Sequence, residues 1–283
     1  MSKRLLHICL MAPRIRAAFE RLRRARRTAL IPFIMGGDPD VMTTRRLIRA
    51  LAEAGADLIE VGIPFSDPLA DGPIIQRAAG RALAGGATPV TIVEALRDVS
   101  RAVRVPLVLL SYWNPILHYG GRGNGAEGTA AFLRAAARSG IAGVIVPDLP
   151  PDEAGEFPRQ AARAGIATVF LASPTSPATR LRQIARASEG FIYYVSLTGT
   201  TGVRDRLAVD WPSGVRQLRL ITTKPICVGF GISTPAQAAR VAGVADGVIV
   251  GSALIRAMEP HLRNRRNIVE AARSFVRRFR AAV

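Results

Sequence analysis

Short apolar segments alternate with longer amphipathic ones along most of this 283-residue chain. The apolar segments are nearly continuous in hydrophobic residues, which is typical of parallel strands covered on both faces. The pattern predicts eight strands, which are Ala29–Met35, Asp57–Ile63, Pro106–Tyr112, Gly143–Asp148, Ala167–Ala172, Phe191–Ser196, Pro225–Gly229 and Gly247–Val250.

The segments between these strands have the spacing of helices, with apolar residues recurring every three or four positions. A further basic helix, Arg14–Arg26, is predicted before the first strand. The other predicted helices are Thr43–Ala54, Pro73–Ala84, Val90–Ala102, Ala130–Ser139, Glu153–Ala164, Pro177–Ala187, Gly214–Ile221, Pro235–Ala242 and Asn264–Ala281.

A similar phrase recurs at the helix-to-strand junctions, as in AGADLIEVG, SGIAGVIVPD, AGIATVFLAS and VADGVIVGS. Glycine or another small residue at the end of each helix suits a helix C-cap. Eight such units in one α/β chain predict a (β/α)₈ TIM barrel with an extra N-terminal helix. A doubly wound sheet is the alternative, but no GxGxxG motif follows the first strand. We expect residues 1–13 to be a flexible extension and residues 14–283 to form a single barrel catalytic domain.

Composition and charge bear on whether the protein binds nucleic acid, spans a membrane or is secreted. The net charge of +18 suggests a nucleic-acid partner, but the arginines are densest in residues 14–27 and 263–280, without interleaved aromatic residues for base stacking. We therefore expect solvated helix faces and no nucleic-acid partner. No apolar run is long enough to cross a membrane, and the first residues lack a convincing signal peptide. Two cysteines, Cys9 and Cys227, form no disulfide framework, so we expect a cytoplasmic protein.

The segment LIEVGIPFSDPLADGP, residues 58–73, contains the strongest candidate chemistry. Glu60 lies within a predicted buried strand, and Asp71 follows in a loop beyond its C-terminal end. A carboxylate in such a strand is costly unless it is paired or protonated. Two carboxyl groups in unlike surroundings can hold different protonation states, as acid–base catalysis requires. The alternative is a structural Glu60 satisfied by hydroxyl or backbone N–H groups.

Glycines follow the last two predicted strands, in Gly229–Ser233 and Gly251–Ser252. Backbone N–H groups of such turns approach an anion closely, and the corresponding loops of TIM barrels commonly bind phosphate. The loop Leu197–Arg206, with its TGTTG sequence, is predicted to be a lid, and its Gly202 could close over the anion. The alternative is that these glycines serve only as turns.

The sequence lacks the residues that two other mechanisms would need, a Schiff-base mechanism and a metal-dependent one. A Schiff-base mechanism needs a lysine at a strand's C-terminal end, but Lys224 precedes the seventh strand and Lys3 lies outside the barrel. The histidines, His7, His118 and His261, are too scattered for a metal centre. We therefore expect metal-free acid–base catalysis by Glu60 and Asp71 on a phosphorylated substrate.

LIEVGIPFSDPLADGPIIQRA closely resembles the signature of tryptophan synthase alpha subunits. The phrases ALIPFIMGGDPD, LVLLSYWNPI, GVIVPDLP, YYVSLTGTTGVR, CVGFGIS and GVIVGSA resemble family segments in the same order, from about Arg14 to about Met258. The segment His118–Gly128 is richer in glycine than is usual in this family. The resemblance implies retro-aldol cleavage of indole-3-glycerol phosphate to indole and glyceraldehyde 3-phosphate.

The resemblance also implies residue roles. Glu60 would move protons at indole C3 and at the glycerol hydroxyl, with a pKa raised by burial toward neutrality. Asp71 would stay ionised and hold the indole N–H. Tyr193 would lie near the catalytic Glu60, unless it is simply a core aromatic, and Thr201 would be a lid residue that meets Asp71. Other implied positions are Phe33, Leu110 and Tyr112 for the indole pocket or for core packing, Gly202, Gly231, Gly251 and Ser252 for the phosphate, and Asp67 and Pro68 facing a partner.

The implied partner is a tryptophan synthase beta subunit in an α₂β₂ complex. Pyridoxal phosphate would belong to that subunit, and this chain would hold no cofactor. Three alternatives remain open: a stand-alone indole-releasing lyase, a related phosphate-binding barrel enzyme, and a non-catalytic regulatory partner of a beta subunit.

Overall fold

A single parallel sheet forms the centre of the molecule in this computed structural model, which describes residues 13–121, 125–195, 211–229 and 231–283. The sheet order is β5-β4-β3-β2-β1-β9-β8-β7-β6. Its strands in the described ranges are β1 (Ala29–Met35), β2 (Ile59–Gly62), β3 (Leu107–Leu110), β4 (Gly143–Ile145), β5 (Ala167–Val169), β6 (Leu171–Ala172), β7 (Ile192–Val195), β8 (Ile226–Gly229) and β9 (Gly247–Val250).

One chain segment supplies both ends of this sheet order. β5 pairs with β4, while β6, which follows after Phe170, pairs with β7. The N–H of Tyr193 also donates to the Phe170 carbonyl oxygen over 3.1 Å. The predicted fifth strand, Ala167–Ala172, is therefore divided into two, and it joins the two ends of the sheet into a barrel. The prediction of a TIM barrel is confirmed.

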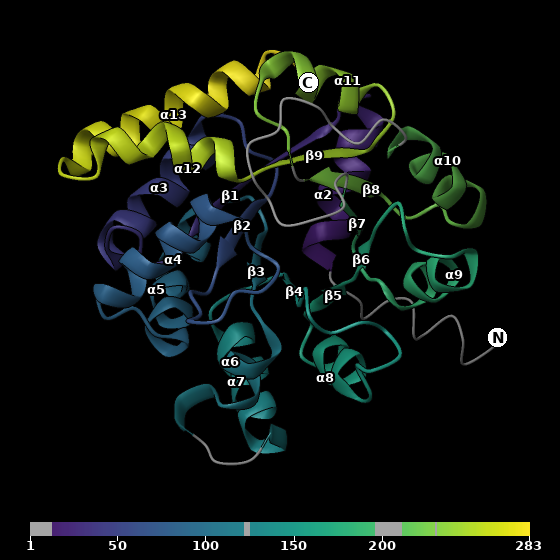
Figure 1. Cartoon of the computed structure of the whole chain (residues 1–283), viewed down its shortest axis with the longest axis horizontal. Coiled ribbons are helices and arrows are strands. Elements are labelled where there is room, and N and C mark those ends of the chain that lie inside the picture. Colours follow the sequence, from purple (N-terminus) through teal and green to yellow (C-terminus); the bar gives the residue numbers. More distant parts are fainter. Residues whose placement is uncertain (1–12, 122–124, 196–210, 230) are drawn as a thin grey trace.

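Helices surround the barrel on its outer side (Figure 1). The structure has two helices that the pattern did not predict, α6 and α12, and α7 begins earlier than expected. The described helices are α2 (Pro13–Arg24), α3 (Val41–Glu53), α4 (Pro73–Ala84), α5 (Pro89–Ala102), α6 (Trp113–Leu117), α7 (Gly125–Arg138), α8 (Phe157–Arg163), α9 (Ala178–Ala187), α10 (Trp211–Ile221), α11 (Pro235–Ala242), α12 (Ser252–Met258) and α13 (Arg265–Arg280), with 3-10 turns at Tyr119–Gly121 and Glu259–His261.

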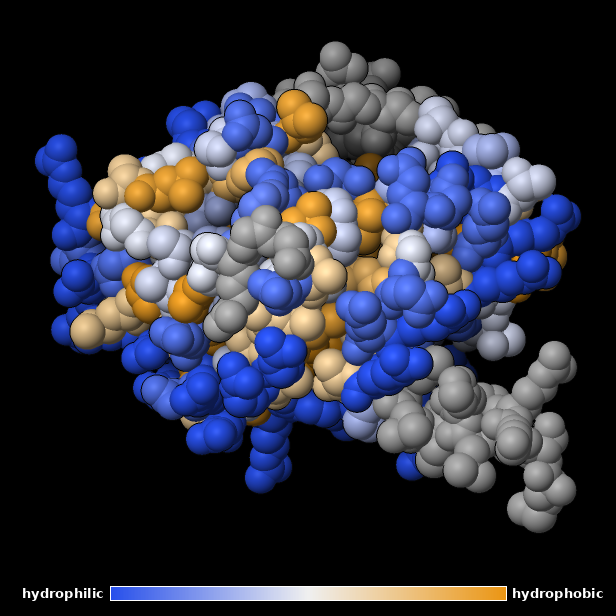
Figure 2. Space-filling view, turned by 90° about the horizontal axis from the view of Figure 1, so that it is seen from below, coloured by the Kyte–Doolittle hydropathy of each residue, from blue (hydrophilic) through white to orange (hydrophobic). Residues whose placement is uncertain are grey.

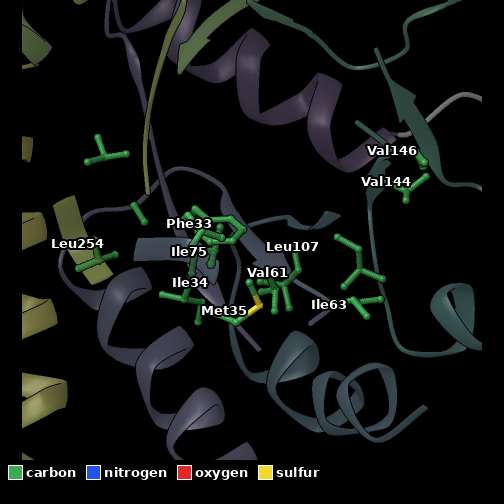
Figure 3. Packing of buried hydrophobic residues seen from close by; sticks show 14 of the residues in the cluster. Phe33, Ile34, Met35, Val61, Ile63, Ile75, Leu107, Val144, Val146 and Leu254 are labelled. Carbon is green, nitrogen blue, oxygen red and sulfur yellow. The ribbon is translucent and has the colours of Figure 1, made fainter. Parts of the chain in front are cut away.

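The alternation of side chains along each strand divides the core into two clusters. In β2, Ile59 and Val61 belong to the outer cluster, which lies between the barrel and its helices. Leu58, immediately before β2, belongs to the inner cluster. Figure 3 shows part of the outer cluster, where Val61 lies close to β1 residues such as Met35. Since successive side chains point to opposite faces of a sheet, Glu60 points with Leu58 into the barrel.

The N-terminal helix α2 closes one end of the barrel, as expected for the extra helix. Its buried residues Ile15, Ala18, Phe19 and Leu22 have the spacing of one helix face, and they belong to the inner cluster. The Phe19 ring lies 5.9 Å from that of Phe191, which precedes β7. α2 therefore covers the amino ends of the strands, and their carboxyl ends form the open mouth.

Hydrophilic side chains are prominent on the face of the molecule seen in Figure 2. They project around the margin of this face, and hydrophobic residues are interspersed among them (Figure 2). Within the described ranges, no helix has the length and apolar character to cross a membrane.

The glycine-rich segment after β3 has a packing role. α7 begins at Gly125 and crosses close to the end of α6. A Cβ atom at Gly128 would lie only 1.8 Å from the carbonyl oxygen of Leu117. Gly120 and Gly121 have φ values of 73° and 69°, in the left-handed region that favours glycine. At least three glycines of this segment are therefore required by close approach or by backbone conformation.

We predict that Gly128→Ala destabilises the protein by about 1–3 kcal/mol, because a carbonyl oxygen cannot yield as a flexible side chain can. The matched control is Gly80→Ala in α4, where nothing lies within 4 Å of the added methyl group. That change should stabilise the fold by about 0.5–1 kcal/mol, since alanine loses less conformational entropy in a helix. Thermal and urea unfolding measure both effects, and equal stability of the two variants would contradict the packing account.

Candidate active site

Glu60 lies near the mouth of the barrel, in the middle of the sheet. Its strand β2 pairs with β1 on one side and β3 on the other, and Glu60 is in register with Phe33 and Val108. Its side chain is 1% exposed. The local sequence places it there because residues 58–63 are otherwise apolar and extended, so that alternation alone directs Glu60 inward.

The environment of Glu60 favours its protonated form. Burial, with a further contribution from the charge of Asp71, raises the pKa of Glu60 to about 8. The Oε2 atom makes no hydrogen bond to any described residue. A purely structural Glu60 would have hydrogen bonds to both carboxyl oxygens, and Oε2 has none among the described residues. A carboxyl group with a pKa near neutrality is suited both to give and to take a proton.

Asp71 lies in the loop between β2 and α4, directly before the helix N-cap Gly72. Burial raises the pKa of Asp71 to about 6, and a hydrogen bond with the Tyr112 hydroxyl opposes this effect. The loop is held by the N–H of Asp71, which donates to the Pro68 carbonyl oxygen over 3.0 Å. At neutral pH Asp71 is thus mostly ionised while Glu60 is mostly protonated.

Tyr112 has a role that the sequence interpretation missed. We expected a wall of the indole pocket, and its ring does stack obliquely on Phe65, with centroids 5.5 Å apart. Its hydroxyl also accepts a hydrogen bond from the N–H of Ala70 over 2.9 Å, which leaves its proton for the Asp71 carboxylate. The signal was present in the sequence, since a tyrosine at the end of β3 must lie beside the loop that follows β2.

Tyr193 lies in the inner cluster on β7, in register with Cys227 of β8. Its pKa is raised well above the usual value by burial and by the nearby carboxyl groups of Glu60 and Asp71. The structure thus brings this hydroxyl into the electrostatic environment of both acids. The ring packs over Gly229, where a Cβ atom would lie 2.4 Å from the tyrosine oxygen.

Phe33 and Leu110 lie on the neighbouring strands on either side of β2, Phe33 within β1 and Leu110 at the end of β3. Phe33 is buried, and Leu110 is half-buried and contacts both the inner and the outer cluster. The Phe33 ring fills the space above Gly62, where a Cβ atom would lie 2.7 Å away from it. Both residues therefore border the mouth next to Glu60, which is compatible with pocket walls and with core packing alike.

The two glycine turns lie at the same mouth. Gly231 has a φ of 74°, and its loop is held by Gln237, whose Oε1 accepts from the N–H of Ser233 over 2.7 Å. Gly251 is the N-cap of α12, and the methyl group of an alanine there would contact Phe33 at 3.4 Å. Ser252 is the first residue of α12. Because Phe33 is the register partner of Glu60, the Gly251 turn lies on the side of the barrel that carries Glu60.

Two other groups of predicted residues have different outcomes. Thr201 and Gly202 lie outside the described residues. Asp67 is exposed and Pro68 is half-buried. Between them and Asp71 lies Leu69, whose side chain is 85% exposed at the rim of the mouth. The loop thus presents a large apolar side chain to solvent.

This arrangement can transfer protons at the buried carboxyl group of Glu60. A protonated acid and an ionised acid lie near each other, with a tyrosine against each. In the part of the chain that the structure describes, no three His, Cys, Asp or Glu side chains are grouped as metal ligands would be.

Comparison with known proteins gives consistent results. The family described as "Tryptophan synthase alpha chain" matches residues 19–283. The tryptophan synthase alpha chain of Geotalea daltonii is 48% identical over 246 residues, covering 87% of this chain and 90% of the relative. The solved structure of tryptophan synthase subunit alpha from Legionella pneumophila is 36% identical, with a TM-score of 0.83 and coverage of 95% and 97%. A tryptophan synthase structure from Mycobacterium tuberculosis is 37% identical, with a TM-score of 0.84 and coverage of 95% and 98%.

We predict that Tyr112→Phe raises the pKa of Asp71 above its value of about 6. The lost hydrogen bond stabilises the charged carboxylate, and such bonds contribute about 1.5–3 kcal/mol, or about one pH unit or more. Asp71 of the variant would therefore stay protonated to higher pH. Carbon-13 NMR of the labelled carboxyl group measures this titration. Tyr119→Phe, at a buried tyrosine whose pKa responds to Glu94 and not to Asp71, is the control. An unchanged or lowered Asp71 pKa in the Tyr112 variant would contradict the assigned bond.

Proposed function

Because this chain belongs to the tryptophan synthase alpha chain family, we propose that it cleaves indole-3-glycerol phosphate to indole and glyceraldehyde 3-phosphate. The observation that carries this proposal is the pair of acids at the barrel mouth, Glu60 with a pKa of about 8 and Asp71 with a pKa of about 6. The order of these values supports a general acid that carries its proton at neutral pH beside an anion that can stabilise positive charge.

The reaction begins with Glu60, which donates its proton to C3 of the indole ring. This makes the ring an electron sink, and the positive charge develops toward the ring nitrogen. The Asp71 carboxylate accepts a hydrogen bond from the indole N–H and stabilises that charge. The bond between C3 and the glycerol chain then breaks, and its electrons restore the aromatic ring. The glycerol hydroxyl loses its proton to the Glu60 carboxylate and becomes the aldehyde, so Glu60 ends protonated as it began.

The remaining residues bind the substrate in this proposal. The backbone at Gly231 and Gly251 and the Ser252 hydroxyl donate to the phosphate. Phe33 and Leu110 contact the indole ring, and Tyr193 stays beside Glu60. The roles of Thr201 and Gly202 stay predictions from the family resemblance. No cofactor of the chain's own takes part in these steps.

We also propose a tryptophan synthase beta subunit as the partner, in an α₂β₂ complex. This partner is supported by two solved structures of tryptophan synthase from Mycobacterium tuberculosis. The match to this chain covers 98% and 99% of the matched chains in these structures. The exposed Leu69, between Asp67 and Asp71, would then be covered by the partner, and pyridoxal phosphate would belong to the beta subunit. The cytoplasmic location stays a prediction.

We predict that Glu60→Gln lowers the rate of indole release by about 10²–10⁴-fold, the usual contribution of a general acid–base group. The amide is similar in size to the protonated carboxyl group, so the fold should be retained, which circular dichroism checks. Glu94→Gln, on the exposed face of α5, is the control and should keep full activity. Indole release by the Glu60 variant at the wild-type rate would reject the assigned role.

The partner proposal predicts that adding a beta subunit raises the rate of indole release by about tenfold or more, equivalent to about 1.4 kcal/mol in the barrier. The assay follows indole with and without the partner, using the purified wild-type chain. The same high rate in both conditions would instead favour the stand-alone lyase, while no cleavage in either would favour a non-catalytic regulatory partner.

A further inference from the structure

A group of four charged side chains joins the carboxyl ends of α4 and α12, two helices whose amino ends adjoin the candidate site. The Arg81 guanidinium forms a two-pronged contact with Asp38, in which Nε and Nη2 each donate to a carboxylate oxygen over 2.8 Å. Its Nη1 lies 3.4 Å from Glu259 Oε1. Arg77, one helical turn earlier, also donates to Glu259, over 3.0 Å and 3.2 Å. Arg81 therefore lies between two carboxylates from distant parts of the chain.

The group joins three βα units of the barrel. Asp38 lies in the loop that follows β1, Arg81 in α4, and Glu259 at the end of α12. α4 and α12 pack against each other and against β1. Ile75 and Leu254 of these two helices contribute to the outer cluster with Phe33 (Figure 3). The charged group thus holds together the ends of elements that already share a core.

These contacts differ from ordinary surface ion pairs. Asp38 is only 4% exposed, and the side chain of Arg81 is 27% exposed. The hydrogen bonds to Asp38 raise the pKa of Arg81. A two-pronged pair of arginine and carboxylate in a half-buried setting fixes both position and orientation. By contrast, the pair between Arg273 and Glu53, which joins α13 to α3, involves a Glu53 side chain that is 59% exposed.

The same three units carry predicted site residues at their mouth ends. β1 carries Phe33, α4 begins two residues after Asp71, and α12 begins at the Gly251 turn. The ring of the substrate and its phosphate lie at opposite ends of one small molecule, so the Asp71 loop and the Gly251 turn must be correctly spaced. A misplacement of about 1 Å can lower a rate by about 10²-fold.

We propose that Arg81 is a positioning residue for the reaction proposed above: through Asp38 and Glu259 it fixes α4 relative to α12, and so sets the spacing between Asp71 and the Gly251 turn. The inference rests on the proposed function. It assigns Arg81 no contact with the substrate.

Two variants separate this role from folding. Glu259→Gln removes the ionic links of both Arg77 and Arg81 to α12 and leaves the buried contact between Arg81 and Asp38 intact. Arg81→Lys keeps a positive charge beside Asp38. The single ammonium group cannot form the two-pronged contact with Asp38 while also contacting Glu259. The matched control is Glu53→Gln, which breaks the 2.9 Å pair with Arg273 between α3 and α13. Melting temperature, kcat and KM are measured for all three and for the wild type.

The decisive comparison uses two substrates, indole-3-glycerol phosphate and its dephosphorylated form, indole-3-glycerol. The second has no phosphate to reach the Gly251 turn, so its cleavage should not depend on the spacing. We expect Glu259→Gln and Arg81→Lys to lower kcat/KM for indole-3-glycerol phosphate about tenfold, mainly by raising KM. For indole-3-glycerol, the same variants should lower kcat/KM by less than about twofold. Glu53→Gln should affect neither.

The other outcomes are distinguishable. If wild-type protein cleaves the phosphorylated substrate and both variants match it, the positioning role is wrong while the proposed function stands. Equal losses on both substrates, in proportion to a lower melting temperature, would show a merely structural role and overturn the inference. If the wild-type protein cleaves neither substrate, the proposed function fails and the inference fails with it.

Discussion

The chemistry of this barrel depends on the cost of placing one carboxyl group in a dry interior. Glu60 is directed inward by strand alternation, and one of its oxygens has no hydrogen-bond partner among the described residues. An ionised carboxylate in that position would lose several kcal/mol of hydration, so the group keeps its proton at neutral pH. Asp71, which keeps a hydrogen-bond donor in Tyr112 and lies in a loop, ionises first. The same interior that opposes charge on Glu60 makes the group useful as an acid.

Much of the fold could be predicted from the sequence because barrel strands are buried on both faces and therefore read as short apolar runs. The division of Ala167–Ala172 into two strands could not be predicted, because the two parts of this segment pair with different neighbours, β4 and β7. The extent of α12 was not predicted because its seven residues follow β9 after Gly251 alone, without a loop to mark them. Gly128 was seen but not explained, since the carbonyl oxygen that excludes a side chain there belongs to another helix.

The candidate site shows the same division. Glu60 and Asp71 could be predicted because a carboxyl group among apolar residues conflicts with its surroundings, and the family resemblance extended this to other positions. The bond between Tyr112 and Asp71 and the contacts of Arg81 depend on side chains brought together from separate βα units. Such pairs leave no periodic signal along the chain.

The basic composition also has a structural use that sequence analysis did not predict. We expected solvated helix faces, yet several cations bind backbone or buried carboxylates at the amino ends of strands. Asp57 accepts from the N–H of Leu30 and pairs with Arg280 of the last helix over 2.7 Å. Lys224 donates to three carbonyl oxygens at the end of α9: those of Ala185, Arg186 and Ser188. Part of the positive charge thus fastens outer helices to the barrel.

The helix α2 has a consequence for molecular traffic. Its apolar face fills the amino end of the barrel with Ile15, Phe19 and Leu22, so no molecule can pass through the barrel from one end to the other. A substrate of the candidate site must therefore enter and leave at the carboxyl ends of the strands. In the proposed complex, a subunit docked over the carboxyl ends of the strands would cover the route of both substrate and product.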